Sequence, residues 1–103
     1  MAATILHRVQ RGAKLLDKKM PGWEDKIHWQ LWMWSNSSCV LGQTFGNYFQ
    51  GLQALGLPLD QAVELGFTQK EDGGTWSQRA ASWSKLGQYW EREIKKRRQK
   101  KCK

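Results

Sequence analysis

Apolar residues recur at intervals of three or four positions at the start of the chain, which is the spacing of one helix face. These positions are Ile5, Val9, Gly12 and Leu16. Thr4 precedes them and is a suitable N-cap, because its hydroxyl can accept a hydrogen bond from a free amide of the first turn. Met20-Pro21-Gly22 interrupts the pattern. The sequence therefore predicts a helix over residues 4–19 and a short second helix over 23–27.

Residues 28–34 follow a different pattern, in which two sets of side chains alternate with a period of two. That alternation is typical of extended backbone. A lone strand has no partner for its backbone hydrogen bonds, so we expect an extended connector across the core. Helical spacing returns after Ser38, a suitable N-cap, and predicts one helix over residues 39–55, with Gly46 as the position where a kink is most easily introduced. Its apolar stripe comprises Leu41, Phe45, Tyr48, Phe49, Leu52 and Leu55.

The rest of the pattern predicts a short helix over residues 61–65, a polar loop over 68–74 and a long final helix that begins at Trp76. Thr75 and Gln78 fit a capping box at the start of this helix. Its apolar stripe comprises Trp76, Ala80, Trp83, Leu86, Trp90 and Ile94. The stripe does not continue past Ile94, so we expect the following residues either to fray or to continue as a solvated helix.

These elements predict an all-α fold: a compact single domain of three main helices and one or two short helices. A chain of 103 residues with 40% hydrophobic residues is long enough for one core and not for two. Seven tryptophans make that core tryptophan-rich, since each buries about 150–250 Å². We place the helical domain at residues 1–94 and a basic tail at residues 95–103.

Positive charge is concentrated at the two ends of the chain, which has a net charge of +8. Residues 1–20 hold five positive charges and one negative charge, and residues 71–103 hold ten and four. Residues 21–70 are slightly acidic, with two positive charges and four negative charges. Such dense like charges repel one another unless a polyanion or an acidic surface neutralises them. On the final helix, Glu91 and Glu93 can pair with Lys95 or Arg97.

Candidate catalytic and metal-binding residues are few. Cys39 is the one plausible nucleophile, but neither His7 nor His28 stands in a recognisable cysteine–histidine motif, and a buried cysteine at a helix start is the simpler interpretation. Two cysteines and two histidines lack the spacing of a zinc site. We therefore expect no catalytic residues, no metal and no cofactor. Cys39 and Cys102 form no disulfide framework and no apolar run reaches about 18 residues, so we expect a cytoplasmic protein without a membrane span.

Several short motifs recur in one order between residues 8 and 94. They are residues 11–19 (RGAKLLDKK), Pro21-Gly22-Trp23, residues 39–43 (CVLGQ), residues 51–57 (GLQALGL) and residues 64–67 (ELGF). In order and spacing they resemble a group of small uncharacterised proteins of actinobacteria and their phages. The resemblance implies a phage or mobile-element setting, and a host cytoplasm, but no catalytic residues. The chain departs from the group at residues 29–34 and in its basic end, where we expect a specific partner to bind.

The basic ends favour binding to nucleic acid or to a nucleoprotein complex. The candidate phosphate-binding residues are Arg8, Arg11, Lys14, Lys18, Lys95, Lys96, Arg97, Arg98, Lys100 and Lys101. Exposed members of the set Trp29, Trp32 and Trp34 would stack on unpaired bases. No sequence-reading motif is recognisable, so the choice between DNA and RNA stays open.

Two alternatives use the same residues differently. The first is a phage-type inhibitor or adaptor of a host protein complex, with tryptophans and arginines as anchors on an acidic partner surface. The second is a basic, tryptophan-bearing helix lying on an anionic membrane, which we favour less because core packing explains the tryptophan stripe. A basic run that serves only solubility is the simplest interpretation of all.

Overall fold

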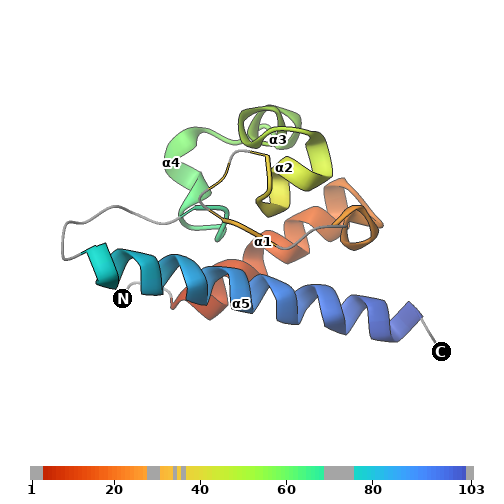
Figure 1. Cartoon of the computed structure of the whole chain (residues 1–103). Coiled ribbons are helices and arrows are strands. Elements are labelled where there is room, and N and C mark those ends of the chain that lie inside the picture. Colours follow the sequence, from red (N-terminus) through yellow and green to blue (C-terminus); the bar gives the residue numbers. More distant parts are fainter. Residues whose placement is uncertain (1–3, 28–30, 34, 36, 69–75, 102–103) are drawn as a thin grey trace.

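The computed structural model describes residues 4–27, 31–33, 35, 37–68 and 76–101, and within these ranges it contains helices and no strand. The all-α prediction is confirmed. The elements are α1 (Ile5–Lys19), the 3-10 helix η1 (Trp23–Lys26), α2 (Val40–Phe45), α3 (Tyr48–Leu55), α4 (Leu59–Ala62) and α5 (Trp76–Lys101). Helices α1 and α5 lie side by side, and α2 to α4 cover them from the other side of the core (Figure 1).

Helix α1 forms as its pattern predicts. The Thr4 hydroxyl accepts a hydrogen bond from the backbone amide of His7 at 3.3 Å, which satisfies one of the free amides of the first turn. Val9, Ala13 and Leu16 are buried on the inner face. The short helix η1 follows directly, and its first residue, Trp23, is fully buried.

The connector after η1 is irregular in its described part, residues 31–33, 35 and 37–39. Leu31 and Met33 are buried whereas Trp32 is 43% exposed, so the predicted alternation is confirmed at these three positions. The amide of Trp32 donates to the carbonyl of Ser38 at 3.2 Å and anchors the connector to the start of α2. Residues 28–30 and 34 lie outside the described residues.

The prediction of one helix over residues 39–55 is wrong, because the segment forms two helices, α2 and α3. Gly46 separates them with φ of 100°, a backbone conformation that only glycine adopts without strain. The two helices pack closely at Gly51, where a Cβ would lie 2.8 Å from the Cβ of Leu41. The predicted cap is also wrong by one residue: the Cys39 thiol, and not Ser38, accepts from the amide of Gly42 at 3.2 Å.

The next short helix, α4, lies at residues 59–62, slightly earlier than the predicted 61–65. Pro58 precedes it with extended backbone, and proline favours the start of a helix because it has no amide to leave unpaired. The chain then turns at Gly66, whose φ is 73°. The predicted loop and its capping box lie largely in residues 69–75, outside the described residues.

Helix α5 is the longest element and continues to Lys101. It runs beside α1 in the same general direction (Figure 1). Trp90, on its inner face, is the centre of the core: its ring is stacked on Phe67 at 5.5 Å and edge-on to Trp23 at 5.7 Å. Its indole N–H donates to the carbonyl of Gly66 at 2.6 Å. Trp83 is partly buried against the same cluster, so the core is rich in tryptophan as predicted.

Candidate functional site

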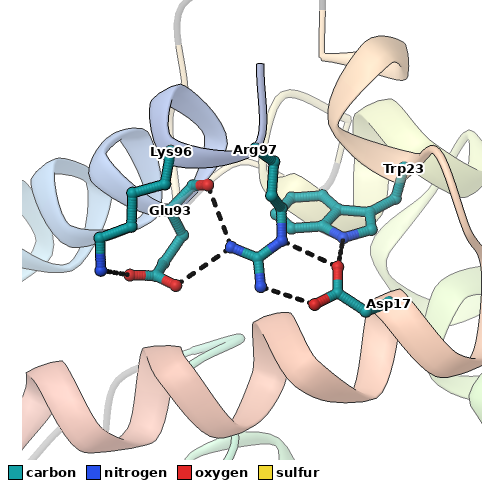
Figure 2. A network of polar contacts seen from close by, with 5 residues as sticks. All are labelled: Asp17, Trp23, Glu93, Lys96 and Arg97. Carbon is teal, nitrogen blue, oxygen red and sulfur yellow. Dashed lines mark hydrogen bonds and ion pairs between the residues drawn. The ribbon is translucent and has the colours of Figure 1, made fainter. Parts of the chain in front are cut away.

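The basic run at the end of α5 is helical, and its side chains therefore point in different directions. Arg97 points inward (Figure 2). Its Nε and Nη2 donate to the two carboxylate oxygens of Asp17 on α1 at 2.8 and 2.7 Å. This is the two-bond geometry in which a guanidinium binds a carboxylate most strongly. The residues it joins are 80 positions apart in the sequence.

The remaining Arg97 nitrogen and the guanidinium face are also engaged. Nη1 donates to the backbone carbonyl of Glu93 at 3.0 Å and to its carboxylate at 3.1 Å. The guanidinium carbon lies 5.4 Å from the ring centroid of Trp23, a cation–π distance. The indole N–H of Trp23 donates to Asp17 at 3.0 Å. The Arg97 side chain is only 18% exposed as a result.

We call Asp17, Trp23, Glu93, Lys96 and Arg97 the Arg97 network. Glu93 is buried to 6% side-chain exposure and also accepts from Lys96 Nζ at 3.2 Å. The sequence predicts a Glu93–Arg97 pair from the spacing of four on one helix. The structure confirms this pair. Asp17 and Trp23 were not predicted as partners. The available signal was that Asp17 is the one acidic residue among the first twenty.

The ion pair changes the acid–base properties of both partners. The hydrogen bond from Arg97 lowers the pKa of Asp17 below its ordinary value, against the opposing effect of partial burial, and the Trp23 indole lowers it further. The same hydrogen bond raises the pKa of Arg97. Asp17 is therefore ionised at neutral pH, and its charge stabilises the folded state relative to the unfolded chain.

This gives a prediction for stability against pH. Because the pKa of Asp17 is lower in the folded than in the unfolded state, its stabilisation is complete above about pH 5 and is lost as pH falls through the folded-state pKa. The Asp17 side chain is 46% exposed, so water screens the pair. We expect the unfolding free energy of the unmodified chain to fall about 0.5–1 kcal/mol more between pH 5 and pH 2 than that of Asp17→Asn. Urea titrations at each pH measure it, and parallel curves would contradict it.

Arg98 has a second set of internal partners. Its Nη2 donates to the backbone carbonyls of Glu24 and Ile27 at 2.8 and 2.6 Å. These carbonyls belong to η1 and the residue after it, where a helix end leaves acceptors without helical partners. Arg97 and Arg98 thus bind the end of α5 to α1 and η1. Both were predicted to contact nucleic acid, and that prediction stays untested.

Two lysines, Lys96 and Lys100, line an open cleft together with residues of the Arg97 network. Asp17, Glu93, Lys96, Arg97, Gln99 and Lys100 form its lining. The two lysines are one helical turn apart on one face of α5, and both are exposed. Lys95 is also exposed but projects from a different side of the helix and does not line the cleft. The Lys101 side chain lies outside the described residues.

The candidate residues of α1 also separate by face. Arg11, Lys14 and Lys18 are exposed, while Arg8 is half-buried. Lys14 and Lys18 lie within one turn of Asp17 on the solvent side of α1. The structure joins the two basic ends of the chain through Asp17 and Arg97.

Aromatic residues give a more mixed result. Trp32 is exposed, as its assignment to a binding surface requires, whereas Trp29 and Trp34 lie outside the described residues. Phe49 is exposed too, although its spacing assigned it to the apolar stripe of one long helix. Phe49 lies in α3, whose buried residues are Gly51, Leu52 and Leu55.

Cys39 is buried at the start of α2, and burial is the main reason why the pKa of its thiol is raised. A raised pKa disfavours the thiolate that nucleophilic chemistry needs. Within the described residues, no group of three or more histidine, cysteine, aspartate or glutamate side chains is placed to hold a metal ion. Among the helices that the structure describes, none is long and apolar enough to cross a membrane.

Comparison of the chain with protein-family models, with curated proteins and with solved structures gives no match. The resemblance to the actinobacterial and phage group therefore stays a prediction.

Proposed function

We propose that this chain is a non-enzymatic protein that binds nucleic acid, or a nucleoprotein complex, through the cations beside the α1–α5 cleft. The observation that carries the proposal is that Lys96 and Lys100 line this cleft while Lys14 and Lys18 are exposed on the neighbouring helix. A phosphate backbone carries regularly spaced negative charges, so a surface with several fixed cations suits it.

The different environments of the basic residues at the end of α5 reduce the number of candidate phosphate contacts. Arg97 and Arg98 donate to acceptors in other parts of the fold, so we assign them to holding the surface and not to contacting phosphate. Lys96 donates to Glu93 of its own helix and stays 61% exposed. Lys95 projects from a different side of α5 than Lys96 and Lys100, so we leave it out of the set. The proposed contacts are made by Arg11, Lys14, Lys18, Lys96 and Lys100. If all five contact phosphates, the logarithm of affinity falls with the logarithm of salt concentration with a slope of about −4.5 on duplex DNA.

The deciding experiment compares two charge-matched double variants. Lys96→Gln with Lys100→Gln removes two cleft cations, while Lys26→Gln with Lys95→Gln removes two exposed cations that do not line the cleft. Since each lost phosphate contact reduces affinity about eightfold at about 0.1 M salt, we expect the cleft variant to bind a labelled 20-base-pair duplex about 60-fold more weakly. The control variant should stay within about threefold. Fluorescence anisotropy across about 50–200 mM salt gives affinities and slopes, with single-stranded DNA and RNA as further probes.

Equal losses in the two variants would show that the net charge of the chain, and not the cleft, attracts the nucleic acid. Weak binding without salt dependence in the unmodified chain would sink the proposal altogether.

The second candidate function is binding to a host protein, and the exposure of Trp32 favours it. A tryptophan that is 43% exposed between two buried neighbours resembles the aromatic anchors of protein interfaces. Under this alternative the cations beside the cleft steer an acidic partner and affect the association rate more than the affinity. Such a role also suits the phage setting that the sequence resemblance implies, and a reducing cytoplasm in which Cys39 stays a free thiol.

A further inference from the structure

An acidic residue beside a surface for polyanions ordinarily opposes binding, because it repels phosphate. Asp17 is such a residue. Its carboxylate lines the cleft together with Lys96 and Lys100, and its side chain is 46% exposed. Charge alone therefore indicates that removing it strengthens binding.

The hydrogen bonds of Asp17 indicate the opposite. They begin a continuous chain of contacts that ends on a cleft cation (Figure 2). Asp17 holds Arg97 through two bonds of 2.8 and 2.7 Å. Arg97 holds the Glu93 carboxylate at 3.1 Å, and the other oxygen of that carboxylate accepts from Lys96 Nζ at 3.2 Å. Each charged group in the chain has an oppositely charged neighbour, so the removal of the first carboxylate affects all the others.

Side-chain exposure falls from Asp17 to Glu93 and rises again at Lys96, the last residue in this chain of contacts. The Arg97 and Glu93 side chains are 18% and 6% exposed, so they are fixed by packing as well as by charge. Lys96 is 61% exposed and remains available to a ligand while its orientation is set by Glu93. Trp23, fully buried under the Arg97 guanidinium, supports the arrangement from the core. A cation held in place before binding loses less side-chain entropy when it contacts a phosphate.

We propose, on the basis of the function inferred above, that Asp17 is a positioning residue for polyanion binding. By holding Arg97 it fixes the last turns of α5 against α1, and thereby keeps Lys96 and Lys100 in place along the cleft. Binding thus depends on a negative charge within a positive surface.

The test is the Asp17→Asn variant, with Glu91→Gln as its matched control. Both remove one negative charge, but Glu91 is exposed on α5 and is not part of the Arg97 network. We expect Asp17→Asn to bind the 20-base-pair duplex about eightfold more weakly at about 0.1 M salt, with a salt slope shallower by about 0.9, which corresponds to one lost phosphate contact. Glu91→Gln should bind as well as the unmodified chain or up to about twofold more tightly, because only repulsion is removed.

Two further measurements separate positioning from a general loss of structure. Amide hydrogen exchange should accelerate at least about tenfold at residues 95–100 in Asp17→Asn while α2 and α3 keep their protection. Asp17→Glu, which retains the carboxylate, should recover part of the lost affinity and of the salt slope. Equal acceleration throughout the molecule would overturn the inference.

The affinities also show which proposal fails. If Asp17→Asn binds as tightly as the unmodified chain or more tightly, while loss of Lys96 and Lys100 still weakens binding, the positioning inference is wrong and the proposed function stands. If the unmodified chain shows no salt-dependent binding, the proposed function fails and the inference that rests on it fails too.

Discussion

Replacing Trp90 by alanine is expected to lower the free energy of unfolding by about 4 kcal/mol. The substitution removes a fully buried ring that is packed between Phe67 and Trp23. It also leaves the carbonyl of Gly66 without the indole N–H that donates to it at 2.6 Å. A buried acceptor without a partner costs about 1–3 kcal/mol. This cost and the loss of packing are not independent, so the total is smaller than their sum. For a domain of this size, the variant would retain only a small part of its stability.

The control is the same substitution at Trp32, which is exposed. Trp32→Ala should lower the unfolding free energy by no more than about 1 kcal/mol, because little apolar area is uncovered. Urea unfolding followed by far-UV circular dichroism compares the two variants without using tryptophan fluorescence, which both substitutions change. Similar midpoints for the two variants would mean that the Trp90 cluster is not the centre of the core.

Gly66 is expected to tolerate substitution much less well than Gly56, although both have the same backbone conformation. Their φ values are 73° and 68°, both in the left-handed region. A Cβ at Gly56 would meet no atom within 4 Å, whereas a Cβ at Gly66 would lie 2.8 Å from the backbone N and Cα of Val9 on α1. The two sites share the conformational cost of about 1 kcal/mol, and only Gly66 adds steric overlap.

We therefore expect Gly56→Ala to lower the free energy of unfolding by about 1 kcal/mol and Gly66→Ala by about 3 kcal/mol. The difference measures how closely the turn after α4 approaches α1. Thermal and urea unfolding of the two variants provide the comparison. Equal effects would imply that α1 moves aside at little cost, so that the crossing near Val9 is looser than its geometry indicates.

The parts of the fold that the sequence predicts well are those in which one pattern governs a whole element. In α1 the apolar spacing, the Thr4 cap and the charges indicate the same helix, and in α5 the apolar spacing indicates it. The segment from Cys39 to Leu55 is different, because its apolar spacing continues through Gly46 while the first helix ends there, at a φ of 100°. The spacing of apolar residues shows which helix face is apolar but not where the chain turns. The sequence therefore predicts at most a kink at Gly46, and not two separate helices.

The sequence names the candidate cations of the site but does not show how they are arranged. Seven positive charges among the last nine residues look equivalent in the sequence, yet the structure gives Arg97 and Arg98 internal acceptors and leaves Lys96 and Lys100 exposed in the cleft. The difference depends on Asp17 and on the carbonyls of η1, which lie more than 70 positions away. Local patterns carry no information about partners at that distance.

The distance along the chain between Asp17 and Arg97 has a consequence for the order of folding. Bringing residues 80 positions apart together costs about 2 kcal/mol more loop entropy than closing a ten-residue turn. Helices α2 and α3 are neighbours in sequence, so we expect them to pair early and α5 to dock on α1 late. Chains that have paired only α2 with α3 lack the cleft entirely. We expect polyanion binding to appear in a refolding experiment only in the final kinetic phase. Binding can then be used as a measure of the fraction of chains that have folded completely.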